Sequence, residues 1–191
     1  MKISESNKQL AKTVVGVFGG TPQVFRYWDE KKISAVDILS CENAPQKGVT
    51  SHATIGLSDH SLVNNGSGSD LRTEFVAAFG SAFEEAANIV STAAFCVINS
   101  KWKIGPGVIF PDVVSMYRKR SEMKHVLFSS PFLWDKLTTQ RLSDKTVAWL
   151  MVVPVSENEY RFAESNGSDA LEDLFASKQI DIFNLDRPSL L

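Results

Sequence analysis

Apolar residues recur at helical spacing near the start of the chain and at alternate positions in several later segments. The helical set near the start is Leu10, Val14, Val15 and either Val17 or Phe18. Residues three or four apart lie on one side of a helix, so this set predicts a helix with one apolar face. Ser4 can cap the beginning of this helix, and the glycines at 19–20 end it.

Alternation between apolar and polar residues predicts strands along much of the remaining chain. The predicted strands cover 35–41, 50–57, 71–80, 125–129, 147–153 and 159–163, and the aromatic segment 23–29 predicts a strand or an irregular turn. In 50–57, His52, Thr54 and Gly56 share one face, and the mostly apolar opposite face is expected to point inward. Residues 64–70 predict a flexible turn, and residues 156–159 predict a hairpin turn.

Two further segments predict helices. The segment 81–99 carries apolar residues around most of its circumference, so it predicts a long helix buried on most sides. Ser168 can cap a short amphipathic helix whose inward residues are Leu171, Leu174 and Phe175. The order of elements predicts an α+β fold: a mostly antiparallel sheet, a long buried central helix, and N- and C-terminal helices packed on it. We expect a single domain over residues 1–191.

The composition argues against several classes of protein. With 20 basic and 22 acidic residues the formal net charge is −2, so the chain as a whole has no basic surface for nucleic acid. The N-terminus lacks the apolar core of a signal peptide, and no stretch approaches the roughly 18 apolar residues of a membrane span. Cys41 and Cys96 have no CxxC spacing and predict reduced, buried thiols. These features favour a cytoplasmic protein.

Opposite charges are concentrated in two blocks that the small net charge conceals. Residues 101–145 contain nine basic and four acidic residues, a difference of +5. Residues 157–186 contain eight acidic and two basic residues, a difference of −6. An acidic surface speeds the capture of a basic partner. The simpler alternative is that the two blocks face each other, or that their side chains are solvated singly.

His52, Asp59 and His60 lie in one polar segment and are the candidates for catalytic or metal chemistry. Eight residues of extended chain would separate the two histidines by about 26 Å, so they meet only across a turn. Adjacent side chains in a strand point apart, which would separate Asp59 from His60. A polar strand followed by a loop is the simpler interpretation, and a small hydrolase or metal enzyme stays the alternative. The GSGSD run at 66–70 lacks the lysine of a phosphate-binding loop, so we expect no cofactor and no metal.

Six segments, in order along nearly the whole chain, carry a recognisable pattern. They are VFGGTPQVFRYWDE (17–30), VDILSCENAPQKGVTSHATIGLSD (36–59), SSPFLWDKL (129–137), WLMVVPVSENEY (149–160), ALEDLF (170–175) and IDIFNLDRPS (180–189). Together they resemble the suppressor of fused-like (SUFU) family, and most closely its bacterial antitoxin-type members. His52 stands where those members are expected to carry an aromatic residue, which argues against a required histidine.

The resemblance implies a protein-binding module rather than an enzyme, with no catalytic residues to carry over. Bacterial members of the family accompany polymorphic toxins, often of the LXG type, whose C-terminal domains include nucleases. The eukaryotic relative is a cytoplasmic inhibitor that binds a transcription factor. The resemblance therefore implies that the chain binds and neutralises a cognate toxin, with no cofactor and no direct contact with nucleic acid or membrane.

The acidic block is the expected contact with a basic, nucleic-acid-binding face of a nuclease toxin. The expected contact residues are Glu157, Glu159, Glu164, Asp169, Glu172 and Asp173. A non-catalytic scaffold, which binds another partner or forms a homodimer, is a further alternative. Its apolar contact surface would be an exposed patch of Phe132, Leu133 and Trp134.

Overall fold

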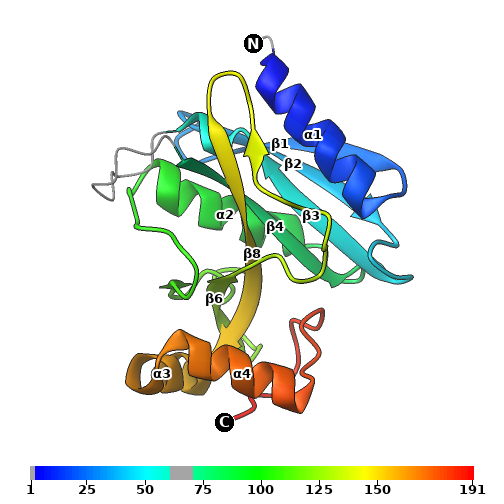
Figure 1. Ribbon diagram of the computed structural model, residues 1–191. Coiled ribbons are helices and arrows are strands. Elements are labelled where there is room, and N and C mark those ends of the chain that lie inside the picture. Colours follow the sequence, from blue (N-terminus) through cyan, green and yellow to red (C-terminus); the bar gives the residue numbers. More distant parts are fainter. Residues whose placement is uncertain (1–2, 61–70) are drawn as a thin grey trace.

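A computed structural model describes residues 3–60 and 71–191 of the chain (Figure 1). Its helices are α1 (Glu5–Phe18), the 3₁₀ helix η1 (Leu57–Asp59), α2 (Ala86–Ile98), α3 (Glu157–Asn166) and α4 (Ser168–Lys178). Its strands are β1 (Pro22–Trp28), β2 (Ala35–Glu42), β3 (Val49–Ile55), β4 (Leu71–Gly80), β5 (Ile109–Phe110), β6 (Met123–Ser129), β7 (Gln140–Arg141) and β8 (Thr146–Ser156). The predicted turn at 64–70, with its GSGSD run, lies outside the described residues.

One mixed sheet contains all the described strands. Its order is β1-β2-β3-β4-β8-β6-β5, and β7 pairs with β8. Every pair is antiparallel except β4 with β8, which run parallel and set Phe75 opposite Leu150. The parallel pair joins the first four strands to the later ones. The prediction of an α+β fold with a mostly antiparallel sheet is confirmed.

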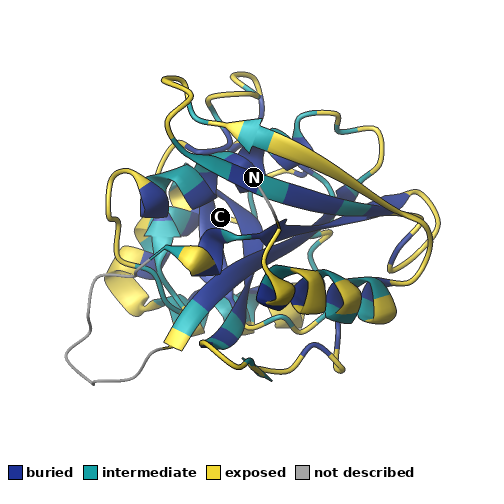
Figure 2. Ribbon diagram, turned by 90° about the horizontal axis from the view of Figure 1, so that it is seen from above, coloured by how far each residue is buried: buried dark blue, intermediate teal, exposed yellow. Residues whose placement is uncertain are grey.

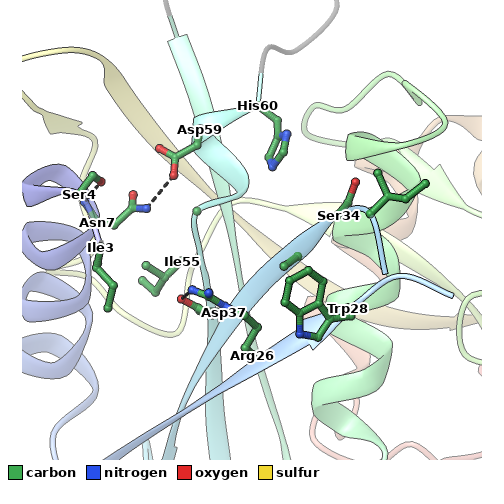
Figure 3. A pocket seen from close by; sticks show the side chains of 13 residues that line it. Ile3, Ser4, Asn7, Arg26, Trp28, Ser34, Asp37, Ile55, Asp59 and His60 are labelled. Atoms are coloured by element: carbon green, nitrogen blue, oxygen red, sulfur yellow. Dashed lines mark hydrogen bonds and ion pairs between the residues drawn. The ribbon is translucent and has the colours of Figure 1, made fainter. Parts of the chain in front are cut away.

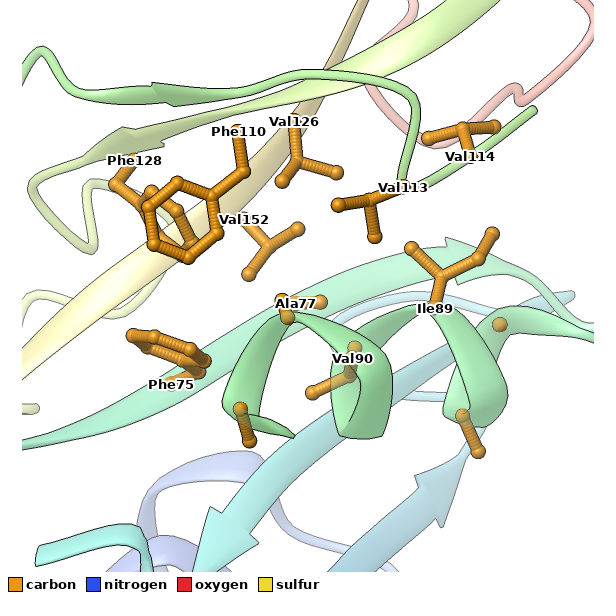
Figure 4. Packing of buried hydrophobic residues seen from close by; sticks show 14 of the residues in the cluster. Phe75, Ala77, Ile89, Val90, Phe110, Val113, Val114, Val126, Phe128 and Val152 are labelled. Carbon is orange, nitrogen blue, oxygen red and sulfur yellow. The ribbon is translucent and has the colours of Figure 1, made fainter. Parts of the chain in front are cut away.

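The sheet lies between helices, because its two faces contribute to two separate apolar clusters. Along β4, Phe75, Ala77 and Phe79 belong to the cluster that contains α2, whereas Val76 and Ala78 belong to the cluster that contains α1. Figure 4 shows the α2 side, where side chains of β4, β6 and β8 gather against the helix. Burial is concentrated in the middle of the sheet (Figure 2), and the outer strand β1 is exposed along most of its length.

Strand β3 confirms that the apolar face of segment 50–57 points inward, and it shows that the opposite face is interior as well. All seven residues of β3 are buried, because α1 packs over one face of the sheet and α2 over the other. The face that carries His52 and Thr54 is therefore also interior, although its side chains are polar. A strand in the middle of a sheet covered on both faces has no solvent side, so alternation in its sequence does not report exposure.

Helix α1 begins and ends as predicted. The Ser4 hydroxyl accepts a hydrogen bond of 3.1 Å from the amide of Asn7. Gly19 follows the last helical residue with a positive φ of 78°, a conformation that side chains with a Cβ rarely adopt. The predicted apolar face packs on the sheet through Leu10, Val14 and Phe18.

The segment 156–163 enters a helix, so the predicted hairpin turn at 156–159 and the predicted strand at 159–163 are wrong. The Ser156 hydroxyl accepts a hydrogen bond of 3.1 Å from the amide of Glu159. The Glu159 carboxylate accepts one of 2.8 Å from the amide of Ser156. This reciprocal pair is a capping box, which begins α3 directly at the end of β8.

The other two helices differ from the prediction at their starts. Residues 81–85 form turns, so α2 begins at Ala86, and it is buried along most of its length as expected. Gly167 is the N-cap residue of α4, so Ser168 is the first helical residue rather than the cap. The inward side of α4 is formed by Leu171 and Phe175, whereas Leu174 is only half-buried.

A buried ion pair ties the segment after α4 to β8 and α3. Arg187 donates hydrogen bonds of 2.6 and 2.7 Å to the carboxylate of Glu159, and one of 3.1 Å to the carbonyl of Pro154. The Glu159 side chain is fully buried, and Arg187 is 4% exposed. The guanidinium also lies 5.3 Å from the ring centre of Phe175, so the same side chain supports α4.

We expect Glu159→Gln to lower the free energy of unfolding by about 3–5 kcal/mol, because it leaves a buried guanidinium without its anion. Denaturant unfolding of both proteins at neutral pH measures this loss. The matched control is Glu164→Gln on the exposed side of the same helix, which should change stability by less than about 1 kcal/mol. Equal stability of the two variants would contradict a structural role for the pair.

Candidate functional site

The segment 48–59 folds around one buried carboxylate, that of Glu74 in β4. The hydroxyls of Thr54 and Ser58 donate hydrogen bonds of 2.6 and 2.7 Å to it. The amides of residues 56–58 donate three more, at 2.9, 3.2 and 3.0 Å. Burial raises the pKa of Glu74, and the hydrogen bonds from Thr54 and Ser58 oppose that rise. The hydroxyl residues of the segment therefore close the turn after β3 onto β4.

His52 belongs to the interior of the protein. Its side chain is enclosed, with the residue 6% exposed, and its Nδ1 lies 2.8 Å from the hydroxyl of Ser40 in the neighbouring strand. Burial lowers its pKa from the usual 6.5 to about 4, so the imidazole is neutral at pH 7. Its Nε2 is buried and has no hydrogen-bond partner among the described residues. This buried, neutral histidine lies against Ser40 of β2 and 6.3 Å from the ring centre of Phe79 in β4, at the base of a small hollow of about 200 Å³.

Asp59 and His60 line a cleft of about 360 Å³ that does not include His52 (Figure 3). We call it the N-terminal cleft, because it lies between the start of α1, the β1–β2 hairpin and η1. At its edge Asp59 accepts a hydrogen bond of 2.7 Å from Asn7 and forms an ion pair with Lys145. The structure therefore separates the candidate trio: two of its members share a cleft, and the third is buried elsewhere.

The N-terminal cleft has the character of a contact surface. Within the described part of the chain, no hydrogen bond pairs the His60 ring with a serine or a carboxylate, which is the arrangement of a coupled nucleophile and base. The same part of the chain contains no group of three His, Cys, Asp or Glu side chains suited to a metal. Ile3, Trp28 and Ile33 line the cleft and are each at least 50% exposed. Exposed apolar side chains grouped in this way are typical of protein-binding surfaces.

The six predicted contact residues divide into one buried residue and an exposed or half-exposed set. Glu159 is fully buried against Arg187, which corrects the expected set by removing it from the surface. The remaining five lie on α3 and α4, at the end of the molecule away from α1 (Figure 1). We call them the acidic face: Glu157, Glu164, Asp169, Glu172 and Asp173.

Three carboxylates of the acidic face lie within about one turn of α4. Glu172 and Asp173 follow Asp169 by three and four residues, so each of them lies next to Asp169 on the helix surface. Burial raises the pKa of Glu172, and the carboxylates of Asp169 and Asp173 add to the rise. The Ser129 hydroxyl opposes it by donating a hydrogen bond of 3.0 Å to Glu172. Like charges held this close favour the approach of a basic partner.

A groove of about 410 Å³ runs beside these carboxylates, between α4 and the strands β6 and β8. We call it the α4 groove. Glu172 and Asp173 lie at it, and its apolar lining comprises Leu127, Phe132, Val153, Phe175, Ala176, Ile180 and Ile182. Sequence reasoning finds the acidic residues here but misses the groove, because its lining comes from several segments that meet only in the fold.

The apolar patch expected at 132–134 does not form as a unit. Phe132 is 55% exposed, Leu133 is half-buried, and Trp134 is 5% exposed. The ring centre of Trp134 lies 4.7 Å from that of Phe18 in α1, so this side chain belongs to the core. Phe132 alone reaches the surface, where it lines the α4 groove.

An ion-paired arginine joins the two charge blocks. Arg118 of the basic block forms ion pairs with Asp186 of the acidic block and with Glu85, and it lies 4.8 Å from the ring centre of Phe83. At this point the alternative in which the blocks face each other is correct. The carboxylates of α4 take no part in this contact.

Two expectations drawn from composition concern the cysteines and the membrane. Both cysteines are free, and they lie on opposite sides of the sheet: Cys41 is buried with the α1 cluster, and Cys96 is half-buried beside the α2 cluster. Burial raises the pKa of both thiols, which reduces their reactivity. None of the described helices has the length and apolar character needed to cross a membrane.

Comparison with known proteins places the chain in a family. The family model described as Suppressor of fused protein (SUFU) matches residues 32–188. The chain belongs to the SUFU family. This SUFU chain is 50% identical over 192 residues to the protein named Immunity protein YqcF of Bacillus subtilis (strain 168), and the match covers 100% of both chains.

Solved SUFU structures share the fold. A SUFU homolog from Neisseria gonorrhoeae FA 1090 gives a TM-score of 0.75 at 13% identity, covering 97% of this chain and 96% of that one. A chain of the Sufu–Fu complex gives a TM-score of 0.70 at 13% identity, covering 98% and 93%. Drosophila Suppressor of Fused gives 0.55, with 87% of this chain matching 42% of that one. At these identities the likeness concerns the fold.

We expect Glu74→Gln to lower the free energy of unfolding by about 3–5 kcal/mol, because an amide nitrogen would face donors that now point at a carboxylate oxygen. Urea unfolding at pH 7 measures the loss, and hydrogen exchange should rise first at residues 56–58. Exposed Glu84→Gln is the control and should stay within about 0.5 kcal/mol of wild type. A loss below about 1 kcal/mol for Glu74→Gln would show that the hydrogen bonds to the Glu74 carboxylate are dispensable for stability.

We expect His52 to make the protein less stable in mild acid. Because folding lowers its pKa from 6.5 to about 4, the unfolded chain takes up a proton between these values that the folded chain does not. Its contribution is lost as pH falls below 6.5, by about 2 kcal/mol between pH 7 and pH 5. The drop in the free energy of unfolding from pH 7 to pH 5 should therefore be smaller in His52→Phe than in wild type. Ser40→Ala keeps the imidazole, so its drop should equal that of wild type. Equal pH dependence in wild type and His52→Phe would exclude this role.

Proposed function

We propose that this chain is an immunity protein that binds a cognate toxin in the cytoplasm and neutralises it. The observation that carries the proposal is the 50% identity, over the full length of both chains, to a protein named as an immunity protein. Identity at this level extends over the surface as well as the core, so it supports a shared kind of activity and not only a shared fold.

Binding, rather than catalysis, is the proposed means of neutralisation. The candidate catalytic trio is divided between the interior and the N-terminal cleft, which supports a non-enzymatic protein. A partner protein is also what a related structure contains, since one SUFU structure is of the Sufu–Fu complex. The proposed mode of inhibition is therefore occlusion, in which the bound chain blocks the toxin's access to its substrate.

The proposed toxin is a polymorphic toxin of the LXG type with a nuclease domain. A nuclease binds its substrate through basic side chains, because nucleic acid presents a dense row of phosphate charges. An acidic partner can cover such a surface, and charge complementarity both speeds the encounter and selects the partner. The acidic face of α3 and α4 has the required sign.

We expect a triple charge reversal of the acidic face to slow association with the toxin domain about tenfold or more at low salt, because it inverts the field that attracts a basic surface. The variant is Glu164→Lys, Asp169→Lys and Asp173→Lys, and stopped-flow or surface plasmon resonance measures the rate. The control is Glu30→Lys, Glu42→Lys and Glu84→Lys, which changes the net charge equally with exposed residues outside α3 and α4.

Equal effects of the two triple variants would contradict an electrostatic role for the acidic face. An unchanged rate after charge reversal, together with loss of binding in Trp28→Ala, would instead place the contact at the N-terminal cleft. Both results are compatible with the immunity function and change only which surface of the chain is proposed to contact the toxin.

The function is tested directly by co-expressing the chain with the C-terminal domain of the toxin encoded beside it. Survival of the cells and co-purification of a stable complex would support immunity by binding. Cell death despite soluble expression of both proteins would contradict the proposal for that toxin. Survival without a complex would contradict occlusion and favour an indirect mechanism.

A further inference from the structure

The α4 groove combines apolar walls with an acidic edge. Its lining includes Phe132, Phe175 and Ile180, and among the described residues its charged side chains are those of Glu172 and Asp173, with no basic one. The volume of about 410 Å³ falls within the roughly 300–1,000 Å³ of sites that enclose a bound group. An open apolar groove beside carboxylates that form no ion pair with its own lining suits a group that is both apolar and positively charged.

We propose that the α4 groove receives one basic, amphipathic helix of the partner protein, with an apolar side chain between Phe132 and Phe175 and a lysine or arginine at Glu172. This inference rests on the proposed function, because the partner is taken to be the toxin. It goes further by naming the recognised element and the two kinds of contact that hold it.

The environment of Glu172 supports the cationic half of the contact. Its carboxylate is half-buried, accepts a hydrogen bond from Ser129, and is repelled by the nearby carboxylates of Asp169 and Asp173. A half-buried carboxylate among like charges gains more from an incoming cation than a solvated one does, because it has lost part of its hydration. The acidic face attracts a basic partner over a distance, and Glu172 forms the direct ion pair with a basic side chain of that partner.

The apolar half of the contact rests on two aromatic side chains of opposite exposure. Phe132 is 55% exposed, so a partner that covers it removes apolar surface from water. Phe175 is 8% exposed, and its ring centre lies 5.3 Å from the buried guanidinium of Arg187. One aromatic side chain of the groove is therefore packed and the other is open to solvent, which suits a single inserted side chain better than a flat sheet-to-sheet contact.

A substitution that fills the groove tests the inference without removing any native contact. Ala176 is exposed and lines the groove, so Ala176→Leu occupies the space meant for the partner, and leucine is a strong helix former. Ser177→Leu is the matched control, because it places a leucine at the next residue of α4, which does not line the groove. Thermal unfolding of Ala176→Leu should match wild type. Ser177→Leu loses the exposed hydrogen bond of 2.9 Å to the Leu174 carbonyl and should stay within about 0.5 kcal/mol of wild type.

Two probes are used with each protein. The first is the catalytically inactive domain of the toxin encoded beside the chain, and the second is a short helical peptide with leucines on one face and lysines on the other. We expect Ala176→Leu to weaken both interactions by about tenfold or more, Glu172→Gln to weaken them several-fold, and Ser177→Leu to leave them unchanged. A peptide with glutamates in place of the lysines should not bind.

The outcomes separate this inference from the proposed function. Toxin binding that survives Ala176→Leu and Glu172→Gln would overturn the groove and leave the immunity function standing. Binding of the lysine peptide at the groove, with no binding of the toxin domain to wild type, would support the groove and contradict the proposed toxin. Peptide binding that ignores Ala176→Leu, or amide chemical shifts that move outside α4 and residues 127–132, would overturn the inference.

Discussion

Five hydrogen bonds converge on the carboxylate of Glu74, and through them one buried side chain connects distant elements of the fold. The bonds hold residues 54–58 against β4 and thereby fix the position of Asp59, the next residue of the chain. Asp59 in turn binds Asn7 of α1 and Lys145 beside β8. One chain of polar contacts, which begins in the interior at Glu74, thus fixes the first helix, the central strands and the β7–β8 hairpin relative to one another.

A second buried carboxylate performs a similar task at the other end of the sheet. Glu159 binds Arg187, and the same guanidinium supports the ring of Phe175. Two of the segments that carry the family resemblance, 149–160 and 180–189, meet in this pair. A third, 36–59, donates the hydrogen bonds to Glu74. The residues of these segments that resemble the family therefore include the contacts that stabilise the fold. The surface proposed for recognition consists of other side chains, which lie on α4 and beside it.

Local signals explain what could be predicted from the sequence, and distant contacts explain what could not. The cap at Ser4 and the spacing of Leu10, Val14 and Phe18 act within one helix, and the alternation of β2 and β4 acts within one strand, so each was predictable. The segment 159–163 alternates like a strand, and only the Ser156–Glu159 capping box identifies it as helical. The partners of Glu74 lie 16 to 20 residues away, and Arg187 lies 28 residues from Glu159. The lining of the α4 groove comes from several separate segments. Neither the burial of these carboxylates nor the shape of the groove therefore follows from local pattern.

The parallel pairing of β4 with β8 has a consequence for how the chain reaches this structure. The register sets Leu71 beside Thr146, so the two central strands meet only after a long intervening segment has been gathered between them. Closing such a loop costs entropy before the contacts of the strands repay it, which slows folding relative to a sheet of simple hairpins. Until β8 docks, β4 presents an open edge rich in apolar side chains, and such edges pair readily with other chains. The time between synthesis of β4 and arrival of β8 is therefore the interval in which this protein is most exposed to aggregation.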